Sequence, residues 1–94
     1  MINQIPKFEI PKSDDIEFVG SIWRSDDHVA VIYRRPDGIW SIWVEYFDED
    51  WPVEWQYSSA SGGLFATEKL AENELNNENS WTMNVIPERF SGSD

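Results

Sequence analysis

A four-residue segment, Arg35-Pro36-Asp37-Gly38, constrains the fold of this chain more than any other feature. Proline presets φ for the first position of a tight turn, Asp tolerates the second, and Gly accepts the left-handed conformation that closes a hairpin. Apolar runs flank the segment, over residues 28–34 and 39–47. We therefore predict a β-hairpin, and the nearly continuous apolar character of its first strand predicts a central position in a sheet.

Alternating patterns around the hairpin predict three further strands. The first covers residues 16–23, with Ile16, Phe18, Gly20 and Ile22 on one face and Glu17, Val19, Ser21 and Trp23 on the other. A short strand with one wet face is predicted over residues 53–57, in which Val53, Trp55 and Tyr57 alternate with Glu54 and Gln56. A last edge strand is predicted over residues 81–85. Between the last two, the small residues 58–63 predict a flexible loop.

One helix is predicted over residues 68–77, with Thr67 as its N-cap. Its apolar residues Leu70, Ala71 and Leu75 span an arc that also includes Glu74. The helix therefore either stops near residue 74 or makes only a narrow contact with the core. The predicted fold is α+β, a small antiparallel sheet of three to five strands with one helix on one face.

A chain of 94 residues has room for one domain. We expect an extended N-terminal arm (1–15), a domain (16–90) and a loose tail (91–94). The arm could be anchored on a domain edge by Ile2, Ile5, Phe8 and Ile10. Six Trp, five Phe and three Tyr can supply a core, and the absence of Cys excludes disulfides and a thiolate zinc site.

Four of the six tryptophans illustrate different expected environments. Trp40 and Trp55 lie on apolar strand faces and are predicted to be in the core. Trp43 lies on the wetter face of its strand, where burial and exposure are equally compatible with the pattern. Trp51 follows an acidic run and is predicted to be exposed.

The charge is unevenly distributed along the chain. Its 18 acidic and 7 basic residues give a net charge of −11. Residues 36–88 contain eleven of the acidic residues and one basic residue, Lys69. This charge opposes direct binding to nucleic acid or to an anionic membrane and attracts a basic protein.

Catalysis and metal binding have little support. The single histidine, His28, follows Asp26 and Asp27, but this pattern is also typical of a turn. Asp48, Glu49 and Asp50 do not follow an EF-hand spacing. We expect no enzyme activity, no cofactor and no metal. The longest apolar run is Val29–Tyr33 and no leader pattern is visible, so a cytoplasmic location is expected.

The leading hypothesis is a small acidic inhibitor that occupies a basic, nucleic-acid-binding surface of a partner protein. One version is a DNA mimic of phage or mobile-element origin that acts against host defence. An immunity protein against a basic toxin nuclease and an assembly domain of a larger complex are the alternatives. The sequence leaves the oligomeric state open, and whether the acidic residues share one face. The predicted contact residues are Glu45, Asp48, Glu49, Asp50, Trp51, Glu54, Glu68 and Glu72.

Overall fold

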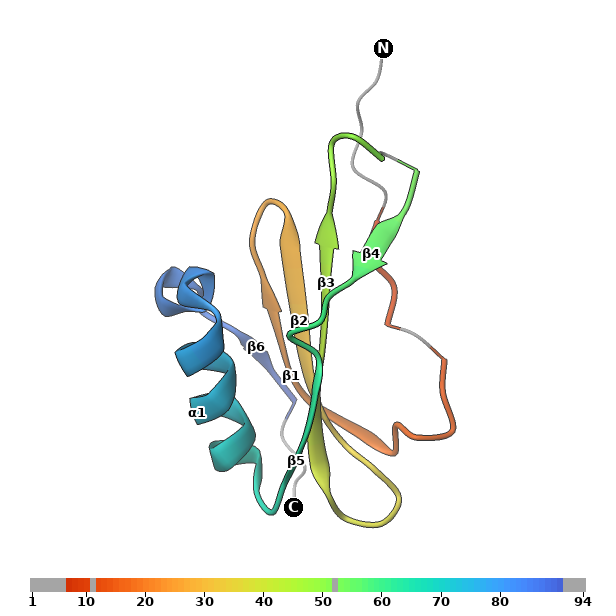
Figure 1. Ribbon diagram of the computed structural model, residues 1–94. Coiled ribbons are helices and arrows are strands. Elements are labelled where there is room, and N and C mark those ends of the chain that lie inside the picture. Colours follow the sequence, from red (N-terminus) through yellow and green to blue (C-terminus); the bar gives the residue numbers. More distant parts are fainter. Residues whose placement is uncertain (1–6, 11, 52, 91–94) are drawn as a thin grey trace.

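The computed structural model describes residues 7–10, 12–51 and 53–90 of the chain. Its elements, in chain order, are β1 (Phe18–Arg24), β2 (His28–Arg34), β3 (Trp40–Phe47), β4 (Trp55–Tyr57), β5 (Gly62–Phe65), α1 (Glu68–Glu78), the 3-10 helix η1 (Ser80–Asn84) and β6 (Glu88–Arg89). The strands form one antiparallel sheet in the order β4-β3-β2-β1-β6, and β5 also pairs with β3. With α1 on one side of this sheet (Figure 1), the predicted α+β class is confirmed.

The predicted hairpin of β2 and β3 is confirmed. At its turn, the Gly38 N–H donates to the Arg35 carbonyl at 2.9 Å, and the Arg35 N–H donates to the Ile39 carbonyl at 2.8 Å. Gly38 has a φ of 87°, in the left-handed region. The Asp37 carboxylate accepts the Ile39 N–H at 3.1 Å, which stabilises the turn from the side chain.

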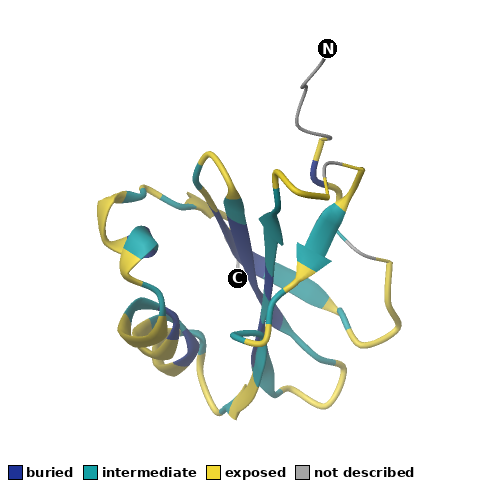
Figure 2. Cartoon of the chain, turned by 45° about the horizontal axis from the view of Figure 1, so that its top comes forward, coloured by how far each residue is buried: buried dark blue, intermediate teal, exposed yellow. Residues whose placement is uncertain are grey.

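The central strand β2 is buried on both faces. Ala30 and Ile32 belong to the core cluster under α1, while Val29, Val31 and Tyr33 belong to a second cluster on the opposite face. None of the five is more than 9% exposed. Figure 2 shows the buried residues concentrated in the middle of the sheet. A strand of this kind needs a cover on each side of the sheet.

The helix α1 covers the first face. The Thr67 hydroxyl accepts the Leu70 N–H at 3.2 Å, which confirms the predicted N-cap. Ala71 and Leu75 are fully buried, but Leu70 is 50% exposed. The helix continues beyond Glu74 to its end at residue 78. Of the two alternatives left by the sequence, the narrow core contact is therefore the correct one.

The second face is covered by the N-terminal segment. Phe8 is 6% exposed and packs in the second cluster, and Ile10 packs against the same cluster. The Phe8 ring meets the Trp55 ring edge-on, with centroids 5.8 Å apart. The segment thus lies over the sheet face and not only along an edge. The other two expected anchors, Ile2 and Ile5, lie outside the described residues.

The predicted faces of β1 are wrong beyond Gly20. The pairing of β1 with β2 shifts by one residue at Gly20, which forms a β-bulge. Ile22 therefore packs in the second cluster together with Val19, while Trp23 packs under α1. An extra residue in one strand inverts the alternation that follows it. A Cβ on Gly20 would lie 2.8 Å from a ring carbon of Trp40, which explains the glycine.

The segment predicted as a flexible loop, residues 58–63, contains the start of a strand instead. Gly62 and Gly63 open β5, which pairs with the first half of β3. The Ser61 hydroxyl donates to the Val44 carbonyl at 3.0 Å and accepts the Val44 N–H at 2.7 Å. The hydroxyl thereby takes the place of the backbone N–H and C=O groups of a paired strand residue, at the break between β4 and β5.

The predicted edge strand over residues 81–85 is also wrong, because the segment forms η1. Thr82 is 1% exposed, and its hydroxyl donates to the Asn76 carboxamide at 2.6 Å. Met83 is 74% exposed. The polar residue thus points inward because α1 offers it a partner. The edge strand is β6, which follows η1 and pairs with β1.

Gly38→Val is expected to lower the free energy of unfolding by about 1–2 kcal/mol, because a β-branched L-residue is strained at positive φ. A Cβ at this position meets no atom within 4 Å, so the effect comes from the backbone alone. Gly38→Asn is the control, since Asn tolerates the left-handed region. Urea unfolding followed by Trp fluorescence measures both variants. Equal losses in the two variants, or helical chemical shifts over residues 28–47, would contradict the hairpin.

Candidate protein-interaction surface

The acidic segment between β3 and β4 forms an ordered turn at one end of the sheet. The Trp51 N–H donates to the Asp48 carbonyl at 2.9 Å. The Asp48 carboxylate accepts the Asp50 N–H at 2.9 Å, a bond that is typical of Asp at the start of a turn. The side chains of Glu49 and Asp50 are exposed. The turn therefore presents its charges to solvent from a defined backbone.

Exposed apolar side chains accompany these charges. Trp51 is 56% exposed, as predicted, and Val53 and Tyr57 are 66% and 60% exposed. The last two were expected on the dry face of a strand, but β4 begins only at Trp55 and is an outer strand. We use the name acidic end for the surface formed by Glu45, Asp48, Glu49, Asp50, Trp51 and Glu54, six of the eight predicted contact residues.

Trp43, whose environment the sequence left open, is partly buried beside the acidic end. Its Nε1–H donates to the Glu45 carboxylate at 2.7 Å, and its ring meets the Tyr57 ring edge-on at 5.2 Å. The register of β3 places Glu45 opposite Val29, on the face of the sheet away from α1. One charge of the acidic end is therefore held in place by an indole.

The other two predicted contact residues, Glu68 and Glu72, do not join the acidic end. Both lie on α1, across the sheet from Glu45. Glu72 binds the Arg89 guanidinium with both oxygens, at 3.0 and 3.2 Å, and this hydrogen bonding raises the pKa of Arg89. The Glu68 carboxylate lies over Gly20. The two helix residues and Glu45 thus lie on opposite faces of the sheet.

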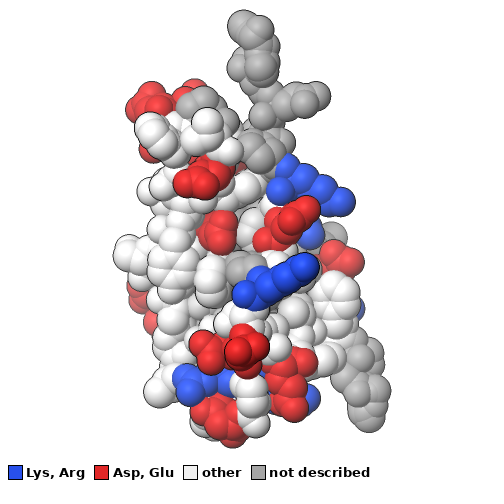
Figure 3. Space-filling view, turned by 90° about the vertical axis from the view of Figure 1, so that its right-hand side faces the viewer, with Lys and Arg blue, Asp and Glu red and all other residues white. Residues whose placement is uncertain are grey.

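The acidic end has no internal counterions among the described residues. The ion pairs of that part of the chain lie elsewhere and join Asp27 to His28, Glu17 to Arg34, Asp37 to Arg35 and Glu72 to Arg89. Residues 36–68 contain neither Lys nor Arg. In Figure 3, acidic side chains lie at the upper end of this face and again at its lower end, and Lys and Arg side chains lie at the upper right, across the middle and beside the lower group. The charge of the acidic end is therefore available to a partner.

His28 is the first residue of β2 and is bonded to the turn that precedes this strand. Its Nδ1 lies 2.8 Å from the Asp27 carboxylate, and its backbone N–H donates to the Ser25 hydroxyl at 3.1 Å. Its ring stacks on Trp81 with centroids 5.2 Å apart. The hydrogen bond with His28 lowers the pKa of the Asp27 carboxyl. Within the described ranges, no group of three or more His, Cys, Asp or Glu side chains is placed to hold a metal ion.

We expect His28→Ala to leave the function of the folded protein unchanged. The variant should lose about 1 kcal/mol of stability, because the aromatic contact with Trp81 is removed. Urea unfolding measures this loss, and circular dichroism checks the fold. A variant that remains folded but loses function would place His28 in the functional site and overturn its assignment to a structural role.

The contact between Asp27 and His28 also predicts a dependence of stability on acid. The folded-state pKa of Asp27 lies below its ordinary value of 3.8. Its contribution is therefore complete above that value and is lost as the pH falls through the folded-state pKa. Because Asp27 is exposed, the contribution is small. From about pH 5 to about pH 2, His28→Ala should lose less stability than the parent chain, and equal losses would contradict the assigned contact.

The acidic end and its exposed aromatic side chains form the candidate surface. No helix in the described part of the chain is long and apolar enough to cross a membrane. Comparison with protein-family models, with curated proteins and with solved structures finds no match to this chain.

Proposed function

We propose that this domain is an inhibitor that binds a basic surface of another protein through the acidic end. One observation supports the proposal above all others: an ordered turn combines exposed carboxylates, free of ion pairs among the described residues, with an exposed Trp51. The carboxylates accelerate association with a basic partner. A large ring that becomes desolvated in the complex slows dissociation.

We further propose that the occupied surface is one that binds nucleic acid. Such surfaces present Lys and Arg side chains that neutralise phosphates, and these are the complement of the acidic end. The acidic residues form a local group there, and Glu68 and Glu72 lie across the sheet. The proposed mechanism is therefore occlusion of part of a nucleic-acid site, and not imitation of a long duplex.

The proposed setting is the cytoplasm, with a host defence protein as the target of a phage or mobile-element inhibitor. It rests on an analogy with other small acidic inhibitors, since the chain has a net charge of −11 and no Cys. An immunity protein that neutralises a basic toxin nuclease would use the same surface with another partner. The partner can be captured from candidate cells at low salt and released at high salt. Identification of the released protein, as a defence protein or as a toxin nuclease, separates these two possibilities.

Charge reversal at the turn is the first test of the proposal. Asp48→Lys, Glu49→Lys and Asp50→Lys in one chain should weaken binding to the captured partner at least tenfold at about 50 mM salt, mainly through the association rate. Surface plasmon resonance at several salt concentrations measures both rates. The matched control reverses the exposed residues Glu9, Asp14 and Asp15, which changes the net charge equally.

Two results would contradict this prediction. Unchanged binding of the turn variant at low salt would show that the acidic end is not the contact surface. Binding that is insensitive to salt from about 50 to about 300 mM would instead favour an uncharged assembly interface, since charge-dependent association is screened over about 8 Å at physiological salt.

Trp51→Ala tests the aromatic part of the surface separately. It should weaken binding by about thirtyfold, or about 2 kcal/mol, mainly through faster dissociation. Stability should change little, because Trp51 is 56% exposed. Val53→Ala is the control, because it also removes exposed apolar area from the connection between β3 and β4. A change confined to the association rate would show that Trp51 is not desolvated in the complex.

A further inference from the structure

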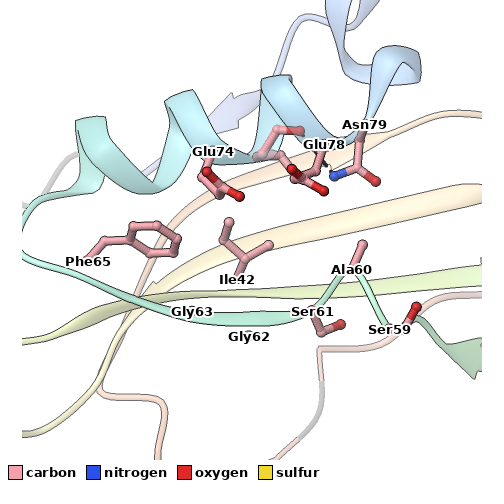
Figure 4. A pocket seen from close by; sticks show the side chains of 11 residues that line it. Ile42, Ser59, Ala60, Ser61, Gly62, Gly63, Phe65, Glu74, Glu78 and Asn79 are labelled. Atoms are coloured by element: carbon pink, nitrogen blue, oxygen red, sulfur yellow. Dashed lines mark hydrogen bonds between the residues drawn. The ribbon is translucent and has the colours of Figure 1, made fainter.

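A second surface feature is a groove between α1 and the edge of the sheet. Its volume is about 220 Å³, and the residues that shape it include Ile42, Ala60, Phe65, Glu74, Leu75 and Glu78. Figure 4 shows the two glutamates directed from α1 toward the strand side of the groove. Small-molecule sites usually measure about 300–1,000 Å³, so this groove is closer in size to a single side chain.

The groove has an apolar floor and an acidic rim. Ile42 and Leu75 belong to the buried core cluster, and Phe65 packs against the same cluster. Glu74 and Glu78 are exposed. Lys and Arg combine an apolar stem with a cationic head, so either one matches both parts of this groove.

The positions of Glu74 and Glu78 are unfavourable for the helix itself. They lie four residues apart on α1, where like charges repel each other. They also lie toward the C-terminal, negative end of the helix dipole, and the last turn of α1 contains no basic residue. No ion pair of the described residues includes either of them. A cation from outside the domain would offset both the repulsion between the two carboxylates and their unfavourable interaction with the helix dipole.

The strand beside the groove has an open edge. β5 pairs with β3, and within the described residues no strand pairs with its other side. Its residues are Gly62, Gly63, Leu64 and Phe65, and Leu64 is 70% exposed. Exposed edges are usually protected by Lys, Pro or a covering segment. β5 contains no Lys or Pro, but Gly62 and Gly63 have φ of 111° and 89° and the pairing of the strand with β3 is irregular. The part of its edge that can accept another strand is therefore Leu64 and Phe65.

We propose that an extended segment of a partner protein adds as a strand to the free edge of β5 and places a Lys or Arg side chain between Glu74 and Glu78. Strand addition supplies backbone hydrogen bonds, and the groove selects the side chain. The inference rests on the proposed function, because it identifies a basic segment as a second contact of the same partner. A second copy of this chain is a poor occupant, since each copy has a net charge of −11.

The probe for this proposal is a synthetic ten-residue peptide of alternating Val and Lys. In a titration followed by amide chemical shifts, we expect changes in residues 62–65 and in the last two turns of α1. Glu74→Gln with Glu78→Gln should weaken binding about tenfold at low salt, since two exposed charge contacts are lost. The control is Glu9→Gln with Glu88→Gln, an equal change of charge at exposed residues elsewhere.

A peptide with N-methyl groups on all of its residues tests strand addition, because it has no backbone donor on either edge. Loss of binding by this peptide is expected. Equal binding of the methylated peptide, equal binding to the Gln variant, or chemical-shift changes confined to residues 48–57 would each overturn the proposal. The Gln variant removes a repulsion, so it should fold at least as well as the parent chain.

The chain with Lys at positions 48, 49 and 50 separates this inference from the proposed function. It should still bind the alternating peptide at the groove, although its binding to the captured partner through the acidic end is weakened at least tenfold. If the peptide does not bind a parent chain that still binds its partner at the acidic end, only the proposal about the groove is overturned. Insensitivity of the partner to both sets of variants overturns the proposed function as well.

Discussion

The fold depends on the burial of β2 on both of its faces. Residues 29–33 are each at most 9% exposed, so neither side of the sheet can be left open to water. On one side α1 supplies the cover, and on the other the segment around Phe8 does so. Each cover is a small element that would not be stable alone. The apolar side chains of the central strand therefore hold the sheet, α1 and the N-terminal segment together.

The elements that the sequence predicts correctly are those with local signals. The turn at residues 35–38 and the Thr67 cap each depend on groups within a few residues of one another. The errors occur where a distant partner decides the outcome. Thr82 points inward because Asn76 on α1 accepts its hydroxyl, and residues 58–61 turn into β5 because Val44 bonds to the Ser61 hydroxyl. Alternation of apolar residues contains no information about such partners.

The candidate surface follows the same division. Asp48, Glu49, Asp50 and Trp51 are contiguous, so the sequence was sufficient to group them and to predict that Trp51 is exposed. Glu68 and Glu72 could not be placed without the topology, which puts α1 across the sheet from the acidic end. The position of Glu74 was visible as a conflict in the helical pattern, whereas that of Glu78 was not. Only the path of β5 shows that the conflict borders a groove.

The aromatic contacts of β4 link the N-terminal segment to the acidic end. The Trp55 ring meets the rings of Phe8 and Phe47 edge-on, with centroid distances of 5.8 and 5.9 Å. β4 itself pairs with β3 over only three residue pairs, so these rings contribute much of its attachment. Packing of the N-terminal segment and attachment of β4 to β3 therefore share the Trp55 ring, so a change that stabilises one is expected to stabilise the other. The rate of hydrogen exchange at the amides of β4 is a single observable that reports on both.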